Sequence, residues 1–140
     1  MAVSRGLPIV SAALALASCV TSLAQGAGVQ AVSPIEGYVC MQLARDAAHL
    51  MDPASAPPML AAPSVDAPTL GTAPYIVIAR VPERVVNGYA EALWLGSTRD
   101  HPVTGWVSAG VLLPFHSTSA PGARCTPTWM SNGQAGVLTR

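Results

Sequence analysis

The sequence predicts an all-β protein, a small barrel or sandwich of five or six short strands. Short runs rich in β-branched and aromatic residues recur along the chain, and proline and glycine residues separate them. No segment shows the long 3.6-residue apolar periodicity of an amphipathic helix. Asn87-Gly88 lies between two such runs. This dipeptide is a strong hairpin signal, because a type I′ turn requires a positive φ at both of its central residues.

Residues 1–24 are predicted to be a secretory signal peptide. Arg5 is the only charged residue before Glu36, and an apolar run from residue 7 to residue 17 follows it. A basic start followed by about 7–15 apolar residues is typical of such a signal. The run is shorter than the roughly 20 apolar residues of a membrane-spanning helix. We therefore expect export, with cleavage after Ala24 in a segment of small residues.

An alternative interpretation makes Cys19 a lipidation site. Leu16-Ala17-Ser18-Cys19 resembles the lipobox of bacterial lipoproteins, in which the cysteine is acylated and becomes the new N-terminus. Acylation would anchor the domain to a membrane, since each buried methylene contributes about 0.8 kcal/mol. Both interpretations remain open, and residues 25–36 are expected to form a linker in either case.

The charge pattern restricts the partners. Charged residues make up 10% of the chain, the formal net charge is zero, and lysine is absent. Binding to nucleic acid or to anionic lipid requires a basic stripe, which this sequence lacks. We therefore expect no nucleic-acid partner, and contact with a membrane only if Cys19 is lipidated.

Cys40 and Cys125 remain in the domain after either form of signal processing. In an oxidising compartment, two such cysteines are expected to form a disulfide. The bond would close a loop containing most of the domain and would stabilise it by about 4 kcal/mol in the chain-entropy treatment. The alternative is a pair of buried free thiols.

The first half of the domain is predicted to hold one regular strand and a long loop. Residues 37–43 alternate apolar and polar side chains as a strand does, and residues 45–51 can form one or two helical turns before Pro53. Six prolines between positions 53 and 74 exclude a helix and central strands there. We expect an ordered loop with short edge strands at Met59–Ala61 and Thr69–Thr72.

The central strands follow. Residues 75–81 and 85–86 are β-branched runs on either side of Pro82, and residues 89–95 form the partner strand beyond the Asn87-Gly88 turn. Glu91 in the middle of that partner strand suggests that its face is partly solvated. Ala90, Ala92 and Trp94 would then face the core, although the opposite register remains open.

The end of the domain is predicted to contain two more short strands and a tail. Residues 96–104 form a polar turn, and strands are expected at residues 105–107 and 111–115. Residues 117–140 make a C-terminal strap that contains a second Asn-Gly turn at Asn132-Gly133.

These elements resemble, in order and spacing, the bacterial SH3-like domains. The resemblance rests on the segment Met59–Gly71, on the central hairpin, and on Gly105-Trp106-Val107 followed by Leu112 or Leu113, and it covers roughly residues 38–115. It implies a strongly bent barrel of about five strands over residues 37–116 and a role without catalysis. Residues 125–136 have no counterpart in the minimal domain, which suggests a subfamily whose strap is held by a Cys40–Cys125 bond.

Aromatic side chains are the candidate binding residues. Tyr89, Trp94 and Trp106 could form a surface that stacks on sugars or on a peptide. The alternative is that Trp94 and Trp106 fill the core of the barrel. Trp129 is expected to pack back onto the barrel.

Catalytic and metal sites are not predicted. Asp100 and His101 are adjacent, so in an extended segment their side chains point apart, and no Gly-x-Ser-x-Gly motif occurs. Asp46, His49 and Asp52 are spaced at three residues, but Pro53 ends the helix that would bring them together. We expect no metal, no cofactor and no enzymatic activity.

The sequence therefore predicts an exported, periplasmic or extracellular, non-catalytic module of the bacterial cell envelope. Its partner would be peptidoglycan or an envelope protein. The alternatives are a membrane-anchored scaffold lipidated at Cys19, and a small inhibitor or enzyme with an unrecognised site.

Overall fold

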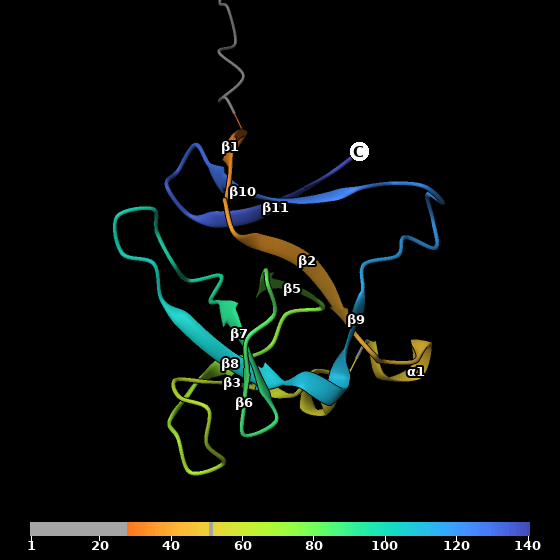
Figure 1. The fold of residues 1–140 in the computed structure, drawn as a ribbon. Helices are drawn as coiled ribbons and strands as arrows, with labels where there is room; N and C mark the ends of the chain where they lie inside the picture. Colours follow the sequence, from red (N-terminus) through yellow and green to blue (C-terminus); the bar gives the residue numbers. More distant parts are fainter. Residues whose placement is uncertain (1–27, 51) are drawn as a thin grey trace, which may run out of the picture.

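The computed structural model describes residues 28–50 and 52–140, and within them the chain is all-β, as predicted (Figure 1). The predicted signal peptide, its cleavage point and Cys19 lie outside the described residues. The strands form two antiparallel sheets, one of three strands and one of eight.

The three-stranded sheet combines the start of the described chain with its end. Its order is β1 (Ala31–Pro34), β10 (Cys125–Met130) and β11 (Ala135–Thr139). The turn between β10 and β11 contains Gly133, with a φ of +83°, at the predicted Asn-Gly position. The C-terminal strap is thus a β-hairpin.

β1 corrects the prediction of a linker over residues 25–36. Ser33 lies opposite Trp129 and Pro34 opposite Thr128, with a register shift between Ala31 and Ser33. The strand is mostly exposed and therefore lacks the apolar alternation that would have revealed it. Its pairing depends on a partner strand about a hundred residues away in sequence.

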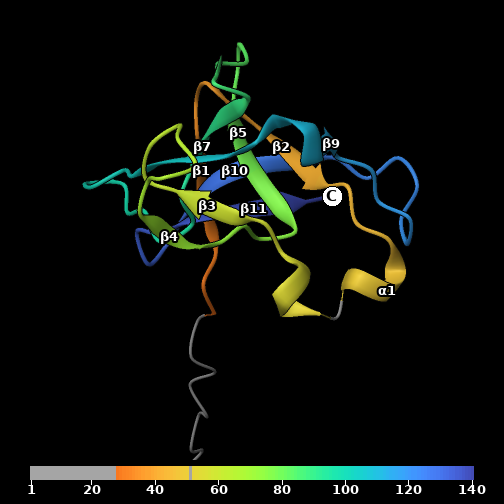
Figure 2. The ribbon, with the colours of Figure 1, turned by 90° about the horizontal axis from the view of Figure 1, so that it is seen from below.

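The eight-stranded sheet contains the rest of the domain (Figure 2). Its order is β4-β3-β8-β7-β5-β2-β9, and β6 pairs with β7 beside this path. The strands are β2 (Tyr38–Leu43), β3 (Pro58–Leu60), β4 (Thr69–Thr72), β5 (Ile76–Arg80), β6 (Val85–Val86), β7 (Tyr89–Leu93), β8 (Thr104–Ser108) and β9 (Leu112–Pro114).

The sheet differs in two respects from the predicted barrel of about five strands. β4 and β9 are the two ends of the hydrogen-bonded path and do not pair with each other, so the sheet is open. The described residues also contain eleven strands. The short strands β3, β4, β6 and β9 lie at segments that the sequence predicts as strands, whereas β1 and the two strands of the strap, β10 and β11, are additional.

The predicted hairpin at Asn87-Gly88 is confirmed. Asn87 has a φ of +51° and Gly88 a φ of +81°, as a type I′ turn requires. The Nδ2 of Asn87 also donates to the carbonyl of Pro63, at 3.0 Å. This bond ties the turn to the loop between β3 and β4.

The helical segments are short. α1 (Ala47–Leu50) falls within the predicted helical turns, and η1 (Pro53–Ser55) and η2 (Ala109–Val111) are single 3₁₀ turns. Arg45 holds the first two together by donating to the carbonyls of His49 and Asp52 and to the Oγ of Ser55. No helix in the described part of the chain combines the length and the hydropathy needed to cross a bilayer.

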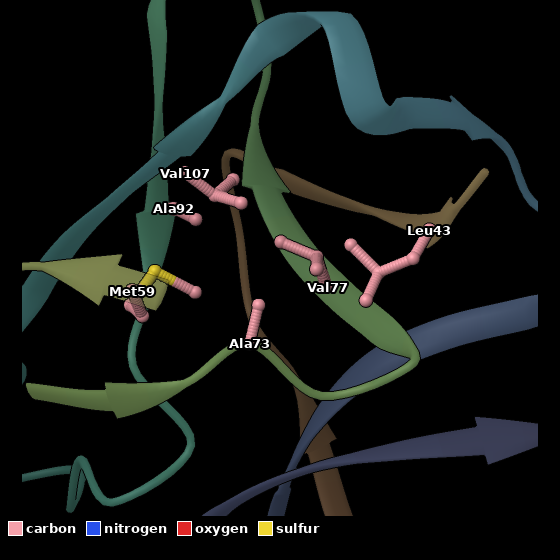
Figure 3. Close-up of a cluster of buried hydrophobic side chains, with 6 residues drawn as sticks. All are labelled: Leu43, Met59, Ala73, Val77, Ala92 and Val107. Carbon is pink, nitrogen blue, oxygen red and sulfur yellow. The ribbon is translucent and has the colours of Figure 1, made fainter. Parts of the chain in front are cut away.

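One hydrophobic core lies within the bend of the eight-stranded sheet (Figure 3). Side chains from β2, β3, β5, β7 and β8 converge there with one residue that follows β4: Leu43, Met59, Ala73, Val77, Ala92 and Val107. Burial of apolar surface of this kind contributes about 25 cal/mol per Å². The contact requires the sheet to bend, because β8, β7 and β5 lie between β3 and β2 in the order of the strands.

A second core joins the two sheets. Ile78 and Leu93 of the larger sheet pack there with Ala135 of β11 and with Ile35, which follows β1. Trp129 packs against this cluster from β10, which confirms its expected position. The strap is therefore part of the folded core.

The predicted disulfide is confirmed. Cys40 of β2 is bonded to Cys125 at the start of β10, and their Cα atoms lie 5.9 Å apart. The bond therefore connects the two sheets covalently.

The prediction that β7 has one partly solvated face is wrong. Ala90 and Ala92 are buried, and so are Glu91 and Leu93 on the other face. Glu91 is only 5% exposed. Its carboxylate accepts hydrogen bonds from Arg80 at 2.9 and 3.1 Å and from Arg84 at 3.0 Å. These two ion pairs, which the sequence pattern does not reveal, allow the carboxylate to be buried.

Candidate functional site

The three aromatic residues predicted to form a binding surface do not lie on one face. Glu91 lies opposite Trp106, and Tyr89 lies opposite Ser108, so Tyr89 and Trp106 share a face of the sheet. Trp94 packs against the core cluster that contains Ala92, which is on the other face. The structure therefore brings together two of the three.

Trp106 is part of the interior. Its exposed fraction is 7%, and it pairs with Leu60 of β3 on one side and with Glu91 of β7 on the other. The guanidinium of Arg84 lies 5.5 Å from the centre of the ring, within the range of a cation–π contact. Since that guanidinium also pairs with Glu91, Trp106 packs beside an ion pair whose carboxylate is buried and whose arginine is partly exposed.

Trp94 is half-buried and is held between two glycines. A Cβ added to Gly96 would lie 2.4 Å from the indole Nε1, and one added to Gly71 would lie 2.8 Å from Cη2. Neither position can therefore carry a side chain without displacing the ring. The indole closes one end of the core beside Leu70.

The residues considered for a metal site have local structural roles. The carboxylate of Asp46 lies 2.5 Å from the Nδ1 of His49, and the carboxylate of Asp52 accepts from the backbone of Ala54 at the start of η1. Within residues 28–50 and 52–140, no group of three or more His, Cys, Asp or Glu residues is placed to hold a metal ion.

A different site lies where the two sheets meet. A hollow of about 400 Å³, which we name the seam hollow, is lined by residues of both sheets and of the loop that follows β7: Pro34, Ile35, Glu36, Tyr38, Leu93, Arg99, Pro102 and Trp129. Tyr38 and Trp129 are both half-buried, and both also pack against the core around Ile78 and Leu93. The hollow thus has aromatic walls with charged groups beside them.

The loop that carries Arg99 is fixed in place. Ser97 is fully buried, and its Oγ accepts from the backbone N–H of Val103 at 2.8 Å. The carbonyl of Ser97 accepts from the N–H of Ala135, and the N–H of Arg99 donates to the carbonyl of Gly133. These bonds attach the loop to the β10–β11 hairpin. The base of the Arg99 side chain is therefore positioned before any ligand binds.

The seam hollow could not be predicted from the sequence. The sequence predicts a polar turn around Arg99 and a linker that contains Glu36, and neither segment indicates a site. The lining residues are spread from position 34 to position 129, and no motif connects them. Only the pairing of β1 with β10, and the contact of that sheet with β2, brings them together.

Comparisons with protein-family models, with curated proteins and with solved structures found no match for this chain.

Proposed function

We propose that this chain is exported and acts as a non-catalytic binding module of the bacterial cell envelope, built on an SH3-like core with a disulfide-bonded strap. The observation that supports this function is the seam hollow, which is lined by two half-buried aromatic side chains, an arginine and a glutamate and is formed between two sheets that a disulfide connects. The disulfide favours an oxidising compartment outside the cytoplasm.

Peptidoglycan is the ligand that this chemistry fits best. Aromatic faces stack on the apolar faces of sugars, and the charged side chains can bond to hydroxyl and acetamido groups. Tyr38 and Trp129 supply the rings, while Arg99 and Glu36 supply a donor and an acceptor. An envelope protein is the alternative partner.

Sedimentation with purified sacculi tests the proposal. We expect the disulfide-bonded protein to pellet with sacculi, and not to pellet with sacculi digested by a muramidase. An uncharged N-acetylglucosamine oligomer, titrated while tryptophan fluorescence is followed, then tests the site. Arg99→Gln should weaken that binding by about tenfold, since a hydrogen bond to a charged group contributes about 1.5–3 kcal/mol.

Arg124→Gln is the charge-matched control, because Arg124 lies outside the seam hollow. It should bind the oligomer as the unchanged protein does. Equal loss in both variants would show a non-specific charge effect. Failure to pellet with intact sacculi would refute the wall-binding function.

The mass of the mature protein tests its localisation. A chain beginning at Gln25 would indicate a free exported protein, and a diacylated or triacylated chain beginning at Cys19 would indicate the membrane-anchored scaffold. A chain that retains Met1 and pellets with neither membranes nor sacculi would contradict export.

A further inference from the structure

Two arginines lie side by side at one end of the strap. The backbone N–H of Arg124 donates to the carbonyl of Arg140 at 2.7 Å, and the N–H of Arg140 donates back to Arg124 at 2.9 Å. Residues that exchange both bonds lie directly opposite each other, with side chains on the same face of the sheet. The two guanidinium groups therefore start from adjacent positions.

Neither guanidinium has an acidic partner in the part of the chain that the structure describes. Arg80 and Arg84 pair with Glu91, and Arg45 bonds to the segment around α1 and η1. No ion pair and no side-chain hydrogen bond involves Arg124 or Arg140 among the same residues. Like charges directly opposite each other destabilise a sheet, so fold stability does not explain this pair.

The two arginines border a hollow of about 410 Å³ on the three-stranded sheet, which we name the basic hollow. Its remaining lining is partly hydroxyl-bearing and partly apolar: Ala31, Val32, Ser33, Pro34, Thr126, Thr128 and Leu138. None of its lining residues is an aspartate or a glutamate. Two arginine side chains beside small apolar and hydroxyl-bearing residues suit a small ligand that has one anionic group and a partly apolar remainder.

We propose that the basic hollow binds the carboxylate of a short peptide. Guanidinium groups present paired N–H donors that match the two oxygens of a carboxylate, and two adjacent arginines can bind it from both sides. The apolar lining from Val32 and Leu138 accommodates a small side chain next to the carboxylate, and Thr126 and Thr128 line the same hollow. This site uses neither Arg99 nor the aromatic rings of the seam hollow, so it does not depend on the proposed function.

An NMR titration of the disulfide-bonded protein tests the proposal, with acetyl-dialanine as the ligand. We expect shifts at the amides of Thr126 and Leu138 and at the Nε–H groups of both arginines. The same dipeptide with an amidated C-terminus should produce no such shifts. Binding should weaken as ionic strength rises, because the groups are exposed and the interaction is screened.

Substitutions then assign the site. Arg124→Gln and Arg140→Gln should each weaken binding of the acid by about fivefold, since each removes one charge-assisted contact at an exposed site. Arg99→Gln removes the arginine of the seam hollow and should leave the affinity for acetyl-dialanine unchanged. A failure of wall binding with these results intact would refute only the proposed function.

Three results would overturn the proposal. They are equal binding of the acid and the amide, unchanged affinity in the Arg124→Gln/Arg140→Gln double variant, and tighter binding of inorganic phosphate than of acetyl-dialanine. The last result would assign the hollow to phosphate-bearing ligands. The ¹H–¹⁵N spectrum of each variant shows whether the sheet is intact, so that loss of folding is not mistaken for loss of binding.

Discussion

Cys40 and Cys125 are bonded to each other from different sheets and are 85 positions apart in sequence. Cys40 lies in β2, inside the eight-stranded sheet, and Cys125 begins β10, the middle strand of the smaller sheet. The sheets are also linked by the chain connections, by the core around Ile78 and Trp129, and by the backbone bonds from Ser97 and Arg99 to the β10–β11 hairpin. The disulfide therefore contributes to the contact on which the seam hollow depends.

Removing the disulfide should destabilise the protein strongly. We expect Cys40→Ala/Cys125→Ala to lower the free energy of unfolding by about 4 kcal/mol, because a loop of this length gains much chain entropy when it is released. Urea denaturation followed by circular dichroism measures the change. Free thiols at both positions in the mature, oxidised protein, seen by alkylation and mass spectrometry, would contradict the prediction.

Replacing Glu91 should weaken the centre of the larger sheet. Glu91→Gln removes the charge that pairs with Arg80 and Arg84. Both arginine side chains are about half exposed, at 46% and 56%, and can turn to water, so the loss should be only about 1–2 kcal/mol. Glu83→Gln, an exposed acid on the segment between β5 and β6, is the matched control and should change stability little. Equal effects in the two variants would argue against the ion pairs.

Adding one methyl group beside Trp94 should also destabilise the fold. Gly96→Ala places a Cβ 2.4 Å from the indole Nε1, and the ring is restricted further because Gly71 lies close to its Cη2 and Cζ2 atoms. We expect a loss of about 1–3 kcal/mol, typical of an overpacked site. Thermal unfolding measures it.

Two comparisons isolate this contact. Gly110→Ala has no neighbour closer than 3.9 Å and should cost far less. In a Trp94→Phe background, which lacks Nε1, the penalty of Gly96→Ala should become smaller. An unchanged penalty would mean that backbone effects, and not the indole contact, are responsible.

The hairpin turn can be tested in two steps. Asn87→Ala should cost about 1–2 kcal/mol, because alanine is unfavourable at a φ of +51°. Asn87→Gly permits that φ and removes only the side-chain bond to Pro63, so its cost should be smaller. The shift of the urea midpoint, at a constant m-value, gives the change in free energy of unfolding for each variant. A glycine variant less stable than the alanine variant would contradict the conformational argument.

Much of the fold could be predicted from local patterns. The alternation in residues 37–43, the β-branched run before Pro82 and the Asn87-Gly88 turn each correspond to an observed element, because strand and turn preferences act over a few residues. The number of cysteines similarly indicated the disulfide. The SH3-like relationship stays a prediction.

One exposed strand could not be predicted. β1 has four residues, is mostly exposed, and depends on β10 for its structure. The burial of Glu91 could not be predicted either, because it also depends on residues of other segments. A carboxylate is buried only when cations reach it, and β5 and the segment before β6 supply these cations across the sheet.

By itself, the sequence determined which segments are strands with strong local signals, where the chain turns, and which two cysteines can bond. The tertiary structure alone decided that Trp94 and Trp106 lie on opposite faces, that Tyr38, Arg99 and Trp129 line one hollow, and that Arg124 and Arg140 share another. The physical reason is the distance along the sequence over which each interaction acts. Turns and strand propensities depend on neighbouring residues, whereas a site depends on pairing between segments that are far apart in the chain.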